Sequence, residues 1–239
     1  MKKIKSKIYN NYPNLYILLK KHIQKKTNFP INIHNFLSKN LNENPLIIEA
    51  GAADGRDTLF FAKKYSKSQI YALEPVEKLF NELIIKTEKY SNVNLQKIAF
   101  DTSTGKSNIF TTDLNSVYYG ASSLMMPEKV LELYPDITFD EKEEVETITF
   151  DDFLNQNKIE RIDLLWFDLQ GKEPEILMQS KSLDLINYIY TEVSLIENYK
   201  DQILYPELKD FLISKNFKIV FEDIRWEDGG NVLFKNKKL

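Results

Sequence analysis

Two carboxylates, Asp168 and Glu192, stand at the ends of runs of large apolar residues. The segment 164–171 reads Leu-Leu-Trp-Phe-Asp-Leu-Gln-Gly, and the segment 190–193 reads Tyr-Thr-Glu-Val. If both runs are neighbouring strands, the two acids share one sheet edge, where they can orient a hydroxyl group and take its proton. The same oxygens suit a magnesium ion, and a lone acid after a strand is often an ordinary loop residue. We predict Asp168 as the first and Glu192 as the second catalytic candidate, without a bound metal.

The composition removes most other kinds of catalytic group. The chain of 239 residues has no cysteine and two histidines, His22 and His34, which both precede the first long apolar run. Disulfides, thiolate zinc sites and cysteine nucleophiles are therefore excluded, and a Ser-His-Asp triad or multi-histidine metal site is not expected. A base in the core of this chain should be a carboxylate.

The segment 46–58, Leu-Ile-Ile-Glu-Ala-Gly-Ala-Ala-Asp-Gly-Arg-Asp-Thr, predicts a strand, a tight turn and a helix of a nucleotide-binding α/β domain. Gly51 lets the backbone approach a ligand, but Ala53 stands where a dinucleotide fingerprint needs its second glycine. Glu49 suits a ligand with a cationic amino-acid end, and S-adenosylmethionine is such a ligand. We predict that this turn binds the cofactor through Glu49, Gly51, Ala52, Ala53, Asp54 and Gly55.

Two further strand ends complete the predicted cofactor site. Glu74 ends the second strand, 19 residues after Gly55, and is followed by Pro75. An acid at this place can accept hydrogen bonds from both ribose hydroxyls, although many strands end in an acid without such a role. After the third strand, Ala99 and Phe100 can border an adenine and Asp101 can accept from its amino group. Asp168 is also predicted to contact the cofactor, besides its catalytic role.

Strands and helices must alternate to bring these residues together. We expect Asp57 to cap the helix after the first turn and leave Asp54 open between capping and ligand binding. The alternation predicts a doubly wound, mostly parallel Rossmann-like sheet with helices on both faces and an antiparallel C-terminal strand pair. The expected strands are 46–50, 69–74, 93–99, 161–168, 188–193, 217–221 and 232–235. The expected helices are 58–67, 77–89, 173–179 and 205–215.

The stretch 101–150 interrupts this alternation. Lys106–Thr111 and Glu143–Phe150 alternate in polarity, and a short helix is expected near 127–134. Loops beyond the carboxyl ends of strands commonly carry specificity. We therefore predict an insertion beside the acceptor site, with Ser122, Ser123 and Gln170 as substrate contacts.

Residues 1–44 form a predicted basic helical extension ahead of a catalytic domain over 45–239. Residues 1–42 hold nine lysines and no acid, whereas the remainder has a net charge of −12. The simpler interpretation is a solvated helix, and the alternative is a weak contact with an anionic surface. The run at 15–19 is too short for a signal-peptide core or a membrane span, so we expect a cytoplasmic protein.

From about Pro45 to Phe234 the chain resembles the FkbM-type S-adenosylmethionine-dependent methyltransferases. The resemblance rests on an ordered set of segments: 49–58, Ala72-Leu-Glu-Pro75, Ala99-Phe-Asp101 with Gly105, Ser122-Ser-Leu124, 147–153, 162–171 and 190–193. It implies methyl transfer from S-adenosylmethionine to oxygen, commonly a sugar or polyketide hydroxyl. We thus expect an O-methyltransferase that acts on a sugar, a glycan or a related metabolite.

The chain departs from the family at Ala53, where Asn or His is usual, and at Lys172, where an apolar or small residue is common. Two other functions stay open: a nicotinamide-dependent oxidoreductase and an inactive binding module that keeps the fold. The first is disfavoured by Glu49, by Ala53 and by the lack of a Tyr-x-x-x-Lys pair. Nucleic-acid methylation is disfavoured because no Asn/Asp-Pro-Pro-Tyr/Phe segment is present and the acidic core would repel phosphates.

Overall fold

The computed structural model describes residues 33–113, 120–224, 226 and 228–239. The chain forms two compact units, Met1–Asn40 and Leu41–Leu239. In the first unit the structure describes helix α3, Ile33–Asn40, in which the Asn40 amide donates to the Phe36 carbonyl. The rest of the predicted basic extension lies outside the described residues, and the predicted boundary after residue 44 stays a prediction.

The second unit is built on a seven-stranded sheet in the order β3-β2-β1-β7-β8-β10-β9. The strands from β3 to β8 run parallel, and β10 is antiparallel to both of its neighbours. This topology confirms the predicted fold class. The seven strands are β1 Leu46–Ala50, β2 Gln69–Leu73, β3 Val93–Gln96, β7 Ile162–Phe167, β8 Ile186–Ser194, β9 Phe217–Asp223 and β10 Gly229–Asn236.

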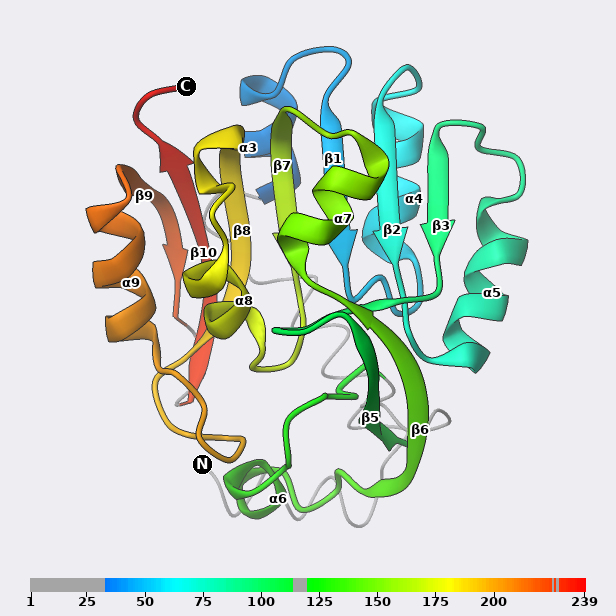
Figure 1. Cartoon of the computed structure of the whole chain (residues 1–239), viewed down its shortest axis with the longest axis vertical. Helices are drawn as coiled ribbons and strands as arrows, with labels where there is room; N and C mark the ends of the chain where they lie inside the picture. The colour runs from blue at the N-terminus through cyan, green and yellow to red at the C-terminus, as the bar shows by residue number, and fades with distance from the viewer. Residues whose placement is uncertain (1–32, 114–119, 225, 227) are drawn as a thin grey trace. The chain divides into compact units, whose positions relative to one another are not determined.

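Helices cover both faces of this sheet, and Figure 1 shows α7 and α8 in front of it and α4 behind it. On the rear face, Phe61 of α4 meets Trp166 of β7 edge-to-face at 5.3 Å between ring centroids, and Leu83 of α5 packs on Ala72. The front face holds the largest cluster of buried apolar side chains, to which α7, α8 and α9 contribute. The helices are α4 Arg56–Lys64, α5 Glu77–Thr87, α7 Phe150–Asn157, α8 Glu173–Gln179 and α9 Tyr205–Ser214, with a 3₁₀ turn, η1, at Leu183–Leu185.

The burial of each strand follows from this arrangement. All six residues of β7 are buried, as expected for a parallel strand covered on both faces. β1 is buried from its second residue onward. Both strands are therefore largely apolar in sequence, apart from the buried acids Glu49 in β1 and Asp163 in β7.

The chain between β3 and β7 forms a smaller three-stranded sheet in the order β4-β6-β5. It consists of β4 Ala99–Phe100, β5 Gly105–Thr112 and β6 Phe139–Ile148, with the short helix α6, Lys129–Leu133, between β5 and β6. Figure 1 shows β5, β6 and α6 beyond the carboxyl ends of β1, β2 and β7. This arm of the structure thus occupies the side of the sheet on which the predicted site residues end.

The structure differs from the sequence prediction at two places, the end of the third strand and helix α7. The third strand was expected to reach Ala99, but β3 ends at Gln96 because its partner β2 ends at Leu73, the last residue of their ladder. Ala99 and Phe100 pair with β6 instead. Helix α7 was not predicted, because the alternating polarity of 143–150 favours a strand up to Phe150. In the structure Thr149 caps this helix by accepting from the Asp152 N–H, which fixes its start.

Within the described residues, no helix has the length and apolar character needed to cross a membrane. The cytoplasmic location expected from the sequence stays a prediction.

Candidate active site

The turn after β1 brings the backbone of β1 against the backbone of β7. Gly51 and Ala53 both have positive φ, 83° and 43°, and the N–H groups of Gly51 and Ala52 donate to the Leu73 carbonyl. A Cβ atom on Gly51 would lie 1.9 Å from the carbonyl oxygen of Asp168. Only glycine fits here, because the strand ends that carry the two site segments touch at this point.

Glu74 ties this turn to the end of β2. Its carboxylate accepts from the Ala53 N–H at 2.8 Å and from the Val76 N–H at 2.9 Å, and the residue is 4% exposed. Burial raises the pKa of Glu74 to about 7, although the two backbone hydrogen bonds oppose the rise. Each carboxylate oxygen keeps a second lone pair, so the side chain can still accept from a ligand.

A pocket opens above these strand ends, with an empty volume of about 540 Å³ including the space open to solvent. Its walls contain eight of the residues predicted to bind cofactor or acceptor: Gly51, Ala53, Glu74, Pro75, Ala99, Phe100, Ser122 and Asp168. The sequence reasoning did not find the apolar part of the wall, which includes Leu79, Ile98, Ile109 and Leu124. Nothing in a single sequence separates such residues from ordinary core.

Five predicted cofactor residues do not line this pocket: Glu49, Ala52, Asp54, Gly55 and Asp101. Glu49 is buried on the α4 face of the sheet, where its carboxylate accepts from the Thr58 hydroxyl at 2.7 Å. Burial raises the pKa of Glu49 well above its ordinary range. Gly55 lies against Leu83 of α5 and serves the packing of the turn.

Neither of the two aspartates near α4 is the N-cap of that helix, so the expected capping role of Asp57 is wrong. Asp57 does not cap the helix: the N-cap is Gly55, without a side-chain hydrogen bond, and Asp57 lies within the first helical turn. An acid in the first turn still complements the helix dipole. Asp54 instead accepts from the Arg56 backbone N–H at 3.1 Å and pairs with the Arg56 guanidinium.

Asp101 stands one residue beyond the pocket wall and is held by Lys172, which lines the pocket. The Lys172 ammonium lies 3.3 Å from an Asp101 oxygen and 2.6 Å from Glu175. The Asp101 carboxylate also accepts from the Thr102 N–H at 2.7 Å. The departure noted at position 172 therefore supplies the cation that faces this acid.

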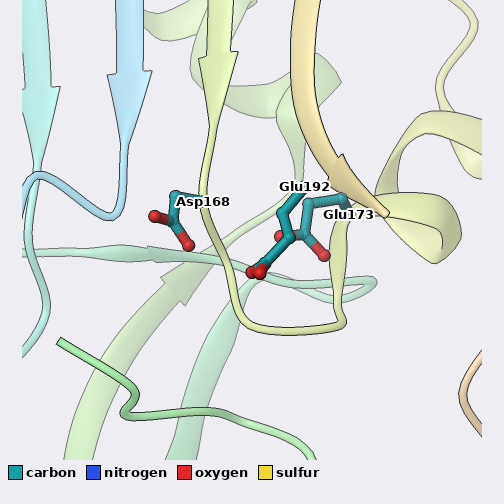
Figure 2. Close-up of side chains that lie close together, drawn as sticks. All are labelled: Asp168, Glu173 and Glu192. Carbon is teal, nitrogen blue, oxygen red and sulfur yellow. The ribbon is translucent and has the colours of Figure 1, made fainter. Parts of the chain in front are cut away.

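Three carboxylates gather at the ends of β7 and β8 and the start of α8: Asp168, Glu192 and Glu173 (Figure 2). One oxygen from each lies within 4.8 Å of the others. Gln170 bridges two of them, because its amide nitrogen donates to Asp168 at 2.7 Å and to Glu192 at 2.9 Å. Glu173, which sequence reasoning did not single out, accepts from the Leu169 N–H at 2.7 Å and the Gly171 N–H at 2.9 Å.

The serines predicted to contact the acceptor are placed differently from each other. Ser122 lines the pocket and accepts from the Thr112 N–H at 3.3 Å. Ser123 is buried; its hydroxyl donates to the Gln170 carbonyl at 2.8 Å and accepts from the Met125 N–H at 3.0 Å. Ser123 thus holds the loop that carries Gln170 and does not face the pocket.

Residues 49–219, most of the second unit, match the family model of the methyltransferase FkbM domain. The chain belongs to the FkbM methyltransferase family. It is 29% identical over 199 residues to 2-O-methyltransferase NoeI of Sinorhizobium fredii, covering 82% of this chain and 81% of the relative. It is 26% identical over 220 residues to methyltransferase sdnD of Sordaria araneosa, covering 81% of each protein.

Among solved structures, the fold is similar to fibrillarin of Aeropyrum pernix with bound S-adenosyl-L-methionine. That similarity has 11% identity and a TM-score of 0.49, over 81% of this chain and 67% of the other. The family match identifies the chain as a methyltransferase, and S-adenosylmethionine is its cofactor, as the sequence predicted. The nicotinamide-dependent and inactive alternatives give way to this assignment.

The pocket residues fit this cofactor. Gly51 lines the pocket, so a ligand there can approach its backbone. Glu74 presents a buried acceptor beside the turn, and Phe100 and its apolar neighbours form a wall suited to a flat ring. The carboxylates suit the positive charges of the cofactor.

The carboxylates of this FkbM methyltransferase have unequal affinities for a proton. Burial raises the pKa of Asp168, with a contribution from Asp57, although Asp168 keeps an accessible surface on the pocket wall. The pKa of Glu192 is raised well above its ordinary range by burial and by the negative charges of Asp168, Glu173 and Asp228. The pKa of Glu173 is raised to about 7, again chiefly by burial. Close, buried carboxylates do not all ionise together, so protons are shared within the cluster.

Proposed function

We propose that this methyltransferase transfers the methyl group to a hydroxyl oxygen of a sugar, a glycan or a related metabolite. The observation that carries the proposal is the Asp168 carboxylate, exposed on the pocket wall and joined through Gln170 to Glu192. An alcohol is a weak nucleophile, so a positioned base should take its proton during attack. The relative NoeI is a 2-O-methyltransferase, which supports oxygen as the acceptor atom.

The cofactor-binding roles follow from the pocket walls. In this proposal the turn at Gly51 and Ala53 approaches the amino-acid part of the cofactor, and Glu74 accepts from the ribose hydroxyls. Ala99 and Phe100 border the adenine. Asp101, held by Lys172, accepts a hydrogen bond from the adenine amino group. Bound S-adenosylmethionine supplies a methyl group that its positively charged sulfur has already activated. The protein therefore mainly has to hold the acceptor oxygen in line and remove its proton.

The different proton affinities divide the catalytic work between the two candidates. Glu192 holds its proton more strongly, because it is more enclosed and faces more negative neighbours than Asp168. Asp168 is therefore the carboxylate that ionises first and takes the proton of the acceptor hydroxyl. Glu192, kept protonated, can donate a hydrogen bond to the acceptor or to Asp168. Ser122 and the adjoining arm border the acceptor.

Turnover by the Asp168→Asn variant tests this assignment. The purified protein is incubated with S-adenosylmethionine and a panel of neutral monosaccharides and glycosides, and products are examined by mass spectrometry for one added methyl group. Asp168→Asn keeps shape and hydrogen bonding but removes the base, so turnover should fall by about 100-fold or more. Binding of S-adenosylhomocysteine should change far less. A variant with wild-type turnover would show that the base lies elsewhere, and methylation of nitrogen only would refute the O-methyltransferase proposal.

A further inference from the structure

Gln170 is held in place from three directions. Its backbone has a φ of 52°, a left-handed conformation that is costly for a residue other than glycine. Its carbonyl accepts from the buried Ser123 hydroxyl, and its amide nitrogen donates to both Asp168 and Glu192. Its amide oxygen lies 3.3 Å from the hydroxyl of Tyr199. A strained backbone with so many fixed contacts indicates that the orientation of this side chain matters.

Tyr199 contacts Gln170 from a loop that is hydrogen-bonded to the arm formed by β5, α6 and β6, which lies beyond the strand ends. The Asn198 carbonyl accepts from the N–H groups of Glu128 and Val130, and the Lys200 N–H donates to the Met126 carbonyl. Tyr199 itself is 4% exposed, so its ring is fixed by packing. Its hydroxyl is therefore brought to Gln170 by the same loop that holds the arm.

We propose that Gln170 and Tyr199 are positioning residues of this methyltransferase, which set the two catalytic carboxylates in a fixed mutual geometry. The Tyr199 hydroxyl donates to the Gln170 amide oxygen, which points both amide hydrogens at Asp168 and Glu192. The inference rests on the proposed function, because it takes these carboxylates to be the catalytic groups. It goes further by naming two residues that act through them without touching the reacting atoms.

The chemistry of the donors and acceptors supports this orientation. Burial and four neighbouring carboxylates raise the pKa of the Tyr199 phenol, so it keeps its proton and is available as a donor. A carboxylate that is ionised only accepts hydrogen bonds, and the amide nitrogen is the end of Gln170 that donates. The amide thereby occupies the position between Asp168 and Glu192 that a bridging cation would otherwise take.

Other ionisable groups also face this pair and enter any pH dependence. They are Asp57 from α4, Glu173 from α8, Tyr199 from the loop after β8, Asp228 before β10 and Glu74 after β2. All of these except Tyr199 are acids, and each ionised acid favours retention of protons by the pair. The Gln170 amide acts in the opposite direction, because its hydrogen bond lowers the pKa of Asp168, as does a hydrogen bond from Glu192.

The test compares Gln170→Met and Tyr199→Phe with the wild type. Methionine keeps the length of the side chain but removes the amide donor, and phenylalanine removes only the hydroxyl. Gln69→Met and Tyr65→Phe serve as matched controls, since Gln69 begins β2 at the opposite end of the sheet and Tyr65 follows α4. The carboxyl carbons of Asp168 and Glu192 are followed by ¹³C NMR from pH 4 to 9 in protein saturated with S-adenosylhomocysteine. Their resonances are assigned by comparison with the variants Asp168→Asn and Glu192→Gln.

We expect the titration of Asp168 to move to higher pH in Gln170→Met and to move less, in the same direction, in Tyr199→Phe. The kcat should fall by about 10-fold and about 3-fold respectively, while the KM for the cofactor stays within about twofold. A merely structural role would lower the melting temperature and leave the titration unchanged. If Gln170→Met does not fold, Tyr199→Phe carries the test alone.

Two outcomes would overturn the inference. One is a titration of Asp168 that coincides with the wild type in both variants while Asp168→Asn is inactive. The other is activity that is lost with EDTA and restored by Mg²⁺, because the Gln170 amide would then have to present its oxygen to an ion. Wild-type turnover by Asp168→Asn, together with a shifted titration in Gln170→Met, would instead refute the proposed base and leave the positioning contact standing.

Discussion

The raised pKa of Glu74 predicts that cofactor binding strengthens as the pH rises through neutrality. Below about pH 7 the buried side chain is protonated, and above it the side chain is ionised. A hydrogen bond to a charged group contributes about 1.5–3 kcal/mol and one to a neutral group about 0.5–1.5 kcal/mol. If the ribose hydroxyls donate to Glu74, affinity for S-adenosylhomocysteine should rise roughly fivefold to tenfold between pH 5.5 and 8.5.

The same shift predicts the opposite trend for the stability of the free protein. Between pH 4.5 and about 7 the unfolded chain releases the Glu74 proton before the native state does, so the free energy of unfolding falls as the pH rises. The shift from 4.5 to about 7 corresponds to roughly 3 kcal/mol of stability, which is fully present below pH 4.5 and lost in full above about pH 7. Glu74→Gln should remove this part of the pH dependence.

Glu173 provides a matched control, since it is also buried, accepts from two backbone N–H groups and has a pKa of about 7. Glu173→Gln should flatten stability against pH as Glu74→Gln does, measured by chemical denaturation. Only Glu74→Gln should flatten the affinity for S-adenosylhomocysteine against pH, measured by isothermal titration calorimetry. A wild-type affinity that is constant from pH 5.5 to 8.5, or one that still varies in Glu74→Gln, would refute the ribose contact.

Three further variants test the construction of the pocket. Gly51→Ala should abolish the rise in melting temperature caused by S-adenosylhomocysteine, because the new Cβ would collide with the Asp168 carbonyl. Gly105→Ala is the control and should keep that rise, since no atom lies within 4 Å of its Cβ position. Lys172→Met should weaken S-adenosylhomocysteine binding by about 3- to 10-fold, because Asp101 loses its partner. An equal loss of affinity in the variant Lys106→Met, at an exposed lysine, would contradict this. Phe100→Ala should lower the free energy of unfolding by about 3–5 kcal/mol in urea, since Phe100 is 1% exposed; a loss below about 1 kcal/mol would show that the site collapses freely.

The sheet could be predicted from the sequence because β1, β2 and β7 are mostly apolar and acids directly follow β2 and β7. β1 and β7 carry this signal most clearly, and Glu74 and Asp168 follow their strands directly. Because parallel strands end at one edge, the meeting of these residues could be inferred without coordinates. The small sheet was harder, since Ala99 and Phe100 continue the pattern of β3 although they pair with β6.

Contacts made by loops could not be predicted from the sequence. Tyr199 lies 29 residues after Gln170, and nothing near either residue indicates that their side chains meet. Glu173 reads as an ordinary acid in the first turn of a helix, although its carboxylate is bound to the preceding loop. Such roles depend on the three-dimensional course of the backbone. The predicted site roles themselves stay predictions until the variants are measured.

The adjacency of β1 and β7 has a consequence for the order in which the protein assembles. The Asp168 N–H donates to the Ala50 carbonyl, so the pocket closes a loop of more than one hundred residues. Contacts so distant along the chain form late and slow the folding of a domain. During synthesis, β1 and β2 leave the ribosome long before β7 and β8 can join them. Ligand binding should therefore appear only with nearly full-length chains, and S-adenosylmethionine should favour the last stage of folding rather than its start.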